Sequence, residues 1–265
     1  MADTLISRSD GLVTITFNRP HKKNALTAAN WSDLDRAVRE VARNPADRAL
    51  ILTGAGGCFS SGAEIASDGD LGNSSLLGNE PQPIIHEVRS VNEIIGQLQR
   101  LAKPTLALVD GVAIGVALGL ALACDFIIAT KRARFAEVFV QRGLSLDGGT
   151  SWSLPHAVGV RRAKEMAFFG DMVGAEDALR WGLINRVVPA EDLQKTGLEW
   201  GRRLADGPST TISLIKRLID DSWTSSFEDS LEQEARAQHV AVTTDDAQEG
   251  LRAFGERREP RFTGR

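Results

Sequence analysis

Three segments combine glycine with small, polar or acidic residues in patterns that suit anion binding or proton transfer. The first, Thr53 to Ile65, reads TGAGGCFSSGAEI and leads from a strand through glycines into a helix. Backbone N–H groups at such a helix start are free to bind an anion, although a tight turn without a ligand fits the same residues. The segment lacks the third glycine of a dinucleotide fingerprint and the Gly-Lys-Ser/Thr of a phosphate loop, which excludes both nucleotide motifs.

The second segment, DGVAIGVALGLALACD, runs from Asp110 to Asp125 and has glycine at every fourth position, at Gly111, Gly115 and Gly119. This spacing gives one helix face a smooth stripe that another backbone can approach closely. Close packing in a core is one interpretation. The other is a second free N–H near Gly115 and Val116, which together with the first segment would form an oxyanion hole.

The third segment, GLSLDGGTSW, places a single acid, Asp147, in an apolar setting flanked by glycine, just before a predicted helix. Its carboxylate could cap that helix through the N–H groups near Gly149 and Thr150. It could equally act as a general base in an apolar pocket. The residues alone leave both interpretations open.

Other chemistry has little support. The sequence has no GxSxG motif around Ser60 or Ser61, no evident histidine partner for Cys58, and no tyrosine. Its two cysteines, Cys58 and Cys124, and its four histidines lack the spacing of a metal site or a disulfide framework. We therefore expect no bound metal.

The pattern of apolar residues predicts the elements that position these segments. Alternation from Leu12 predicts a strand that ends at Pro20, and helical spacing predicts a helix over Asn24–Arg43 with Thr27 as N-cap. Further strands are expected in ALILTGAG, PTLALVDG, DFIIAT, ARFAEV and INRVVP. Further helices are expected at His86–Leu101 and in GVALGLALACD, GTSWSLPHAVG, RRAKEMAFFG and AEDALRWG.

Strand, turn and helix follow one another repeatedly, which predicts an α/β fold with parallel strands joined by right-handed crossovers. From Glu191 onward the pattern is helical almost throughout, which predicts a separate helical layer. Ser67–Pro83 mixes Ser, Gly, Asp, Asn and Pro and is predicted to be a surface loop bordering the site.

Charge and hydropathy exclude several classes of protein. The 265 residues include 31 Lys and Arg against 35 Asp and Glu, and a net charge of −4 is poorly suited to nucleic acid. The start, MADTLISRSDG, lacks the apolar run of a signal peptide. The longest uncharged apolar run, Gly111 to Cys124, is shorter than the roughly 20 residues of a membrane span. We expect a cytoplasmic protein without membrane contact.

These segments, in this order, resemble the enoyl-CoA hydratase/isomerase (crotonase) superfamily. The resemblance covers nearly the whole chain, through ITFNRPHKKNAL, LTGAGGCFSSGAEI, KPTLALVDGVAIGVALGLALACDFIIA, FAEVFVQRGLSLDGGTSWSLPHAVG, AEDALRWGLINRVV and EGLRAFGERREPRF. It implies a spiral of repeated ββα turns over residues 1–195, followed by a helical trimerisation region over residues 196–265. It also implies a homotrimer, or a hexamer built as a dimer of trimers.

The resemblance further implies an acyl-CoA substrate whose thioester oxygen is held by two backbone N–H groups, here those of Ala63 and Val116. The family usually has glycine at the second position, and valine keeps the N–H. CoA is expected along His21–Ala25 and Ala63–Ile65, and Arg257 is expected to reach its phosphates. The residues expected to bind CoA or the substrate are Lys22, Lys23, Ala25, Ser61, Ala63, Ile65, Val116 and Arg257. No cofactor is implied beyond the CoA that the substrate carries.

The sequence departs from the family where hydratases carry two glutamates, because it has Gly119 and Phe139 there. Asp147 instead falls where Δ3,Δ2-enoyl-CoA isomerases have Glu and where dienoyl-CoA isomerases, epoxyphenylacetyl-CoA isomerases and an aromatic acyl-CoA dehalogenase have Asp. Glu137 is offset by two residues from the second hydratase position and is interpreted as structural.

The predicted activity is therefore double-bond isomerisation of an enoyl-CoA, with Asp147 as base and acid. Three alternatives stay open. The first is a hydratase with displaced acids such as Glu137 or Glu64, and the second is a hydrolase or dehalogenase with Asp147 as nucleophile. The third is an acyl-CoA-binding or assembly protein without catalysis.

Overall fold

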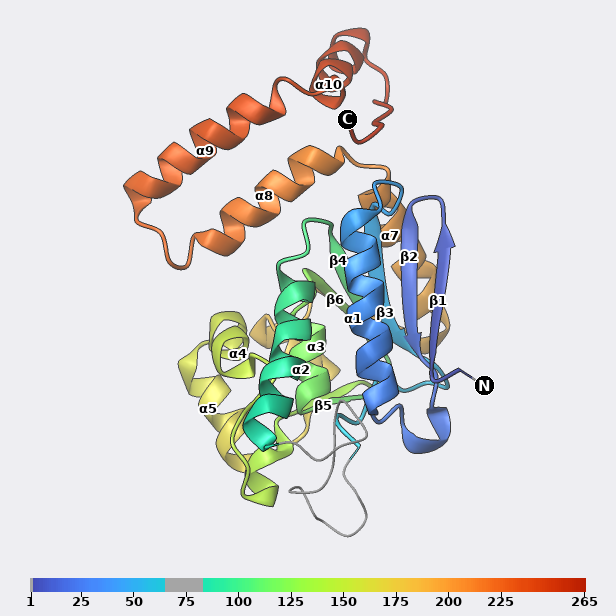
Figure 1. The fold of residues 1–265 in the computed structure, drawn as a ribbon, viewed down its shortest axis with the longest axis vertical. Coiled ribbons are helices and arrows are strands. Elements are labelled where there is room, and N and C mark those ends of the chain that lie inside the picture. Colours follow the sequence, from blue (N-terminus) through green and yellow to red (C-terminus); the bar gives the residue numbers. More distant parts are fainter. Residues whose placement is uncertain (1, 65–82) are drawn as a thin grey trace.

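A computed structural model describes residues 2–64 and 83–265 (Figure 1). Its larger sheet has six strands in the order β1-β2-β3-β4-β6-β9. Strand β1 pairs antiparallel with β2, and every other pair in this sheet is parallel. The bounds are β1 Thr4–Ser9, β2 Leu12–Phe17, β3 Ala49–Gly54, β4 Thr105–Val109, β6 Phe126–Thr130 and β9 Arg186–Val188. The predicted α/β fold with parallel strands is confirmed.

A second sheet has three strands in the order β5-β7-β8, with bounds Val112–Ile114, Arg134–Ala136 and Val173–Gly174. Successive turns of the chain contribute one strand to each sheet, first β4 and β5 and then β6 and β7, which produces the expected spiral. The helix predicted in GVALGLALACD is present as α3, Val116–Leu122, and the short strand β5 directly precedes it. Among the described residues, no helix is long and apolar enough to cross a membrane.

Helices cover both faces of the larger sheet. On one face lie α1, Ala28–Arg43, and α2, Ile84–Gln99, which pack against a core that includes Trp31, Leu52 and Leu98. Helix α1 begins as predicted at Thr27, whose side chain accepts a hydrogen bond from the Asn30 N–H in a capping box. The other helices of the core are α4 Thr150–Val158, α5 Val160–Phe169 and α6 Ala175–Trp181, with 3₁₀ helices η1 Pro20–Lys22, η2 Val138–Arg142 and η3 Ala190–Asp192.

Helix α7, Leu193–Ala205, covers the opposite face of the sheet and packs on Leu12, Ile51 and Leu108. The predicted boundary between residues 195 and 196 falls inside this helix. The helices that leave the core are therefore α8 Ser209–Asp221, α9 Phe227–Ala241 and α10 Asp245–Glu256, here called the C-terminal arm (Figure 1).

Polar contacts hold the arm to the core at two places. The Arg48 guanidinium donates to Ser209 Oγ, to the Gly207 carbonyl at 2.6 Å and to the Phe262 carbonyl. Farther along α8, Lys216 Nζ lies 2.9 Å from a carboxylate oxygen of Asp125. These contacts fix the direction in which α8 leaves the sheet.

The arm has apolar side chains that the described residues leave largely exposed. No residue of α8 or α9 is buried, and the exposed residues include Ile219, Trp223, Phe227, Leu251 and Phe254. An amphipathic helix needs a surface to cover its apolar face. The resemblance and these faces together favour association between copies of the chain.

We expect a trimer or hexamer in solution, because only association would bury the apolar faces of the arm. Multi-angle light scattering at micromolar protein concentration measures the mass directly. A monomer under these conditions would contradict the prediction.

Candidate active site

Two segments predicted to carry oxyanion donors run side by side. The Ser60 N–H donates to the Val112 carbonyl at 2.9 Å, and the Ile114 N–H donates to the Ser60 carbonyl at 3.3 Å. Gly62 then passes so close to this strand that an added Cβ would lie 2.7 Å from the Ile114 carbonyl oxygen. Ala63 and Val116 follow immediately after this contact, one on each segment.

Both candidate N–H groups lack hydrogen-bond partners among residues 2–64 and 83–265. Within the described residues, neither the Ala63 N–H nor the Val116 N–H donates a hydrogen bond, and Val116 is the first residue of α3. Gly115 precedes it at φ +56°, a left-handed conformation that favours glycine. The Phe139 ring packs over Gly115, with a ring carbon 3.4 Å from where a Cβ would lie.

The predicted CoA-binding residues form one hydrogen-bonded loop cluster beside Ala63. The Ser61 N–H donates to the Lys23 carbonyl at 3.0 Å, and the Ala25 N–H donates to the Lys22 carbonyl at 3.1 Å. Both lysine side chains are exposed and so accessible to a phosphate. Ile65 lies outside the described residues, as does nearly all of the predicted surface loop at 67–83.

Arg257 does not join this cluster within one chain. It is the C-cap of α10, and α10 lies at the opposite end of the molecule from η1 and the start of α1 (Figure 1). The expected contact of Arg257 with CoA is therefore not formed inside a single copy. Another copy of the chain would have to supply it.

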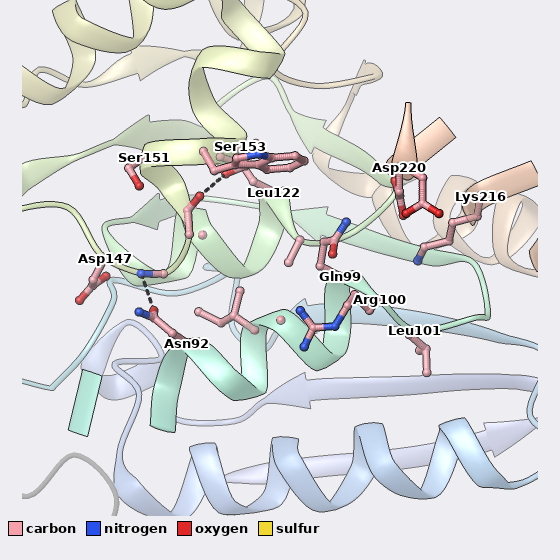
Figure 2. A pocket seen from close by; sticks show the side chains of 18 of the residues that line it. Asn92, Gln99, Arg100, Leu101, Leu122, Asp147, Ser151, Ser153, Lys216 and Asp220 are labelled. Atoms are coloured by element: carbon pink, nitrogen blue, oxygen red, sulfur yellow. Dashed lines mark hydrogen bonds between the residues drawn. The ribbon is translucent and has the colours of Figure 1, made fainter. Parts of the chain in front are cut away.

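Asp147 lies at one end of a cavity of about 790 Å³ (Figure 2). Lys216 and Asp220 from α8 lie at the other end, and Asn92, Gln99 and other residues of α2 line the side between them. This volume is within the usual range for small-molecule sites. The sequence suggested an apolar pocket around Asp147 but not the walls of this cavity, because they come from elements far apart in the chain.

The Asp147 side chain does not cap α4, so that interpretation is wrong. The N-cap is Gly149, which forms no side-chain cap, and it is the Asp147 backbone carbonyl that accepts from the Thr150 N–H and hydroxyl. Oδ1 of the carboxylate is buried without a hydrogen-bond partner in the described structure. Burial raises the pKa of Asp147 to about 6, which suits a general base near neutral pH.

Asn92 on α2 positions the Asp147 loop, and the sequence analysis missed it. Its Oδ1 accepts a hydrogen bond of 3.0 Å from the Gly148 N–H (Figure 2). No motif marks an asparagine on a helix face as a loop anchor, so only the tertiary structure identifies it.

The position of the first hydratase glutamate is filled by backbone. A Cβ on Gly119 would lie 2.5 Å from the Gly148 carbonyl oxygen, a contact that side-chain rotation cannot relieve. Gly148 in turn lies against Val116, so the Asp147 loop packs directly on the start of α3. With the Phe139 ring at the second position, the paired glutamates of a hydratase have no room in this arrangement.

Two further acidic side chains, Glu64 and Glu137, lie near the site and differ in burial and in ion pairing. Glu64 is held by Arg19, whose guanidinium nitrogens lie 3.0 and 3.2 Å from its two carboxylate oxygens. Glu137 is fully buried, and burial followed by the negative charge of Asp147 raises its pKa to about 9. Glu64 is thus held in an ion pair, whereas Glu137 has no basic partner in the described structure.

A family model described as enoyl-CoA hydratase/isomerase matches residues 7–265. The chain belongs to the enoyl-CoA hydratase/isomerase family. It is 34% identical over 255 residues to the 1,2-epoxyphenylacetyl-CoA isomerase of Escherichia coli strain K12, covering 96% of each protein. It is 38% identical over 257 residues to a probable enoyl-CoA hydratase of Rhodobacter capsulatus, covering 97% of this chain and 96% of that protein.

The fold agrees with this family. The crystal structure of enoyl-CoA hydratase from Bacillus anthracis matches with a TM-score of 0.91 at 28% identity, covering 99% of this chain and 100% of that one. The resemblance found in the sequence is therefore confirmed, and so is the crotonase fold class. The relatives carry the names of different reactions, so the reaction of this enoyl-CoA hydratase/isomerase family member has to be argued from its own site.

We expect Gly119→Ala to destabilise the protein, because its methyl group would push the Gly148 backbone away from α3. Overpacking of this kind typically lowers the free energy of unfolding by about 1–3 kcal/mol. Gly255→Ala in α10 is the matched control, since a Cβ there meets nothing within 4 Å. Urea denaturation at fixed protein concentration measures both variants, and equal stability of Gly119→Ala and wild type would contradict the close contact.

Proposed function

We propose that this protein is an acyl-CoA double-bond isomerase in which Asp147 is the single base and acid. The observation that carries the proposal is the placement of Asp147. Its carboxylate has no partner among the described residues and lies at the end of the cavity, while the Gly148 backbone occupies the space of the first hydratase glutamate. One base that takes and returns a proton suits isomerisation better than the activation of water.

In the proposed reaction, ionised Asp147 removes a proton from C2 of a 3-enoyl-CoA. The electron pair of that C–H bond moves toward the thioester and forms an enolate, whose oxygen carries the negative charge. Asp147 then returns the proton to C4, so that the double bond moves from C3–C4 to C2–C3. The proton and the electron pair are conserved, and the proposal requires no metal or redox cofactor.

The N–H groups of Ala63 and Val116 are proposed to hold the enolate oxygen. Their lack of partners in the described structure supports this role. Two free backbone donors can bind the negatively charged oxygen without breaking an existing hydrogen bond. The exposed Lys22 and Lys23 beside Ser61 are proposed to bind the phosphates of CoA. Binding by Arg257 is proposed to need a second copy of the chain.

A hydratase remains the main alternative, because Glu137 is a second carboxyl near Asp147. Glu64 is less suitable as its acid, since Arg19 holds both oxygens. A panel of 2-enoyl-, 3-enoyl- and ring-containing acyl-CoA thioesters separates the reactions by product mass and double-bond position. A trapped acyl-enzyme would favour the nucleophilic alternative, and CoA binding without turnover would favour a binding protein.

Asp147→Asn should lower turnover of a 3-enoyl-CoA by about 10²–10⁴-fold, the usual effect of losing a general acid or base. In the wild type, kcat/KM should rise with pH through about 6, because only the ionised carboxylate accepts a proton. Stopped-flow absorbance of the conjugated product measures both the turnover of the variant and the pH dependence of kcat/KM in the wild type. Asp220→Asn at the other end of the cavity is the matched control and should show no such loss with short acyl groups.

Hydratase activity that survives Asp147→Asn but is lost in Glu137→Gln would overturn the isomerase proposal in favour of the hydratase alternative.

Val116→Pro should lower kcat by about 10²–10³-fold, because it removes one oxyanion donor. The first position of a helix tolerates proline, so α3 should persist. Val116→Gly keeps the N–H and should retain activity. A fully active Val116→Pro, or a folded but inactive Val116→Gly, would show that the Val116 N–H does not hold the substrate oxygen.

A further inference from the structure

Glu137 lies next to the candidate oxyanion donor, although the proposed reaction does not use it. It directly follows β7, whose last carbonyl, that of Ala136, accepts a 2.9 Å hydrogen bond from the Gly115 N–H. That bond fastens the end of β7 to the start of α3. The Glu137 side chain is fully buried where these two elements meet.

Among the described residues, no basic group stabilises a negative charge on the Glu137 carboxyl. Its exposure is 0%, and neither of its oxygens has a hydrogen-bond partner in the described structure. The neighbouring Thr150 hydroxyl donates its hydrogen to the Asp147 backbone carbonyl at 2.8 Å. The interaction of this hydroxyl with Glu137 lowers the pKa of the carboxyl, but burial and the charge of Asp147 outweigh it.

No described cation compensates Glu137 either. The nearest arginines along the chain are Arg134 on β7 and Arg142 on η2, and their guanidinium groups donate to the Ala133 and Val138 carbonyls. Asp147 is the one charged group in the described structure that acts on the Glu137 carboxyl, and its charge is of the same sign. An isolated ionised carboxylate is very unfavourable in such surroundings.

Two neighbouring acids in this environment do not ionise together. Burial alone raises the pKa of Asp147 to about 6, whereas burial followed by the charge of Asp147 raises the pKa of Glu137 to about 9. Between these values the pair carries one negative charge, and its titration belongs to both residues. Separated pKa values of this kind mark acid and base roles in enzyme sites.

We propose that Glu137 and Asp147 form an acid pair with a single negative charge, and that the proton kept by Glu137 leaves Asp147 ionised. Glu137 is then a positioning residue that acts through Asp147. If Glu137 held the charge instead, Asp147 would keep a proton at neutral pH and could not accept one from a substrate. The role of Asp147 as base rests on the proposed function. The single negative charge of the Glu137–Asp147 pair does not depend on that function.

The pair predicts how stability depends on pH. Folded Glu137 holds a proton that unfolded Glu137 releases above its ordinary pKa of 4.5, so the wild type loses stability from there up to about pH 9. Glu137→Gln cannot titrate and lacks this loss. Relative to the variant, the folded-to-unfolded ratio of the wild type should fall by up to about tenfold per pH unit across this range.

Urea denaturation of both proteins at several pH values and one protein concentration measures this slope. Any constant difference caused by the amide itself cancels in the comparison. Adding Asp147→Asn should end the slope at a lower pH, because Glu137 then ionises without a charged neighbour. A stability difference between wild type and Glu137→Gln that does not change with pH would overturn the pair, as would a slope that Asp147→Asn leaves unmoved.

Activity against pH gives a readout that packing alone would not move. The wild type should lose kcat/KM above about pH 9, when a second negative charge forms beside Asp147, and Glu137→Gln should lack this alkaline loss. The acidic limb should keep its midpoint in the variant. A shift of that midpoint to lower pH would mean that Glu137 is charged in the wild type, which overturns the proposal.

The two proposals can fail separately. The predicted stability slope together with full turnover in Asp147→Asn would support the pair and reject Asp147 as the base. A flat stability difference together with loss of turnover in Asp147→Asn would reject the pair and retain the base.

Discussion

The candidate site depends on a close backbone contact between α3 and the loop that carries Asp147. At Gly119 the helix has no side chain, and the Gly148 carbonyl occupies the space that a Cβ would need. Because Gly148 also packs on Val116, the same contact sets the distance between Asp147 and the candidate oxyanion donor. A methyl group at either glycine would alter the geometry of both, so the helix, the loop and the chemistry are fixed together.

The buried and half-buried acids discussed here fall into two groups, those with a basic partner and those without one. The acids that hold strands and helices together have basic partners, as in Asp110 with Arg132 and Asp125 with Lys216. Burial would raise the pKa of Asp110, but its hydrogen bonds from Arg132 and Thr130 outweigh burial and lower it. Asp147 and Glu137 have no basic partner in the described structure. Their pKa values therefore follow burial, which is a property of the fold around them.

The sequence predicted most of the fold because strong apolar patterns mark its elements. The strand before the first glycine segment and the Thr27 cap of α1 lie where they were expected. Strand β1 was not predicted, because it is a mostly exposed edge strand, TLISRS, with few apolar residues. Strand β5 was not predicted, because a buried apolar run of three residues has no periodicity that separates strand from helix.

The site was predictable only where one segment contained the signal. Asp147 stood out as the single acid of a glycine-containing segment, and the resemblance to a family supplied the candidate oxyanion donors. The cavity, the Asn92 anchor and the state of Glu137 depend on residues from α2, α8, β7 and the Asp147 loop. These elements come together only in the folded chain, so no local sequence pattern predicts the cavity, the anchor or the protonation of Glu137.

One wall of the cavity belongs to α8, which lies outside the sheet-and-helix core. The end that holds Asp147 is built from the core, whereas Lys216 and Asp220 at the far end come from the arm. Evolution can therefore change the size and polarity of the far end through substitutions in α8 without moving the acid. The two ends of the cavity can thus diverge independently, because separate parts of the chain build them.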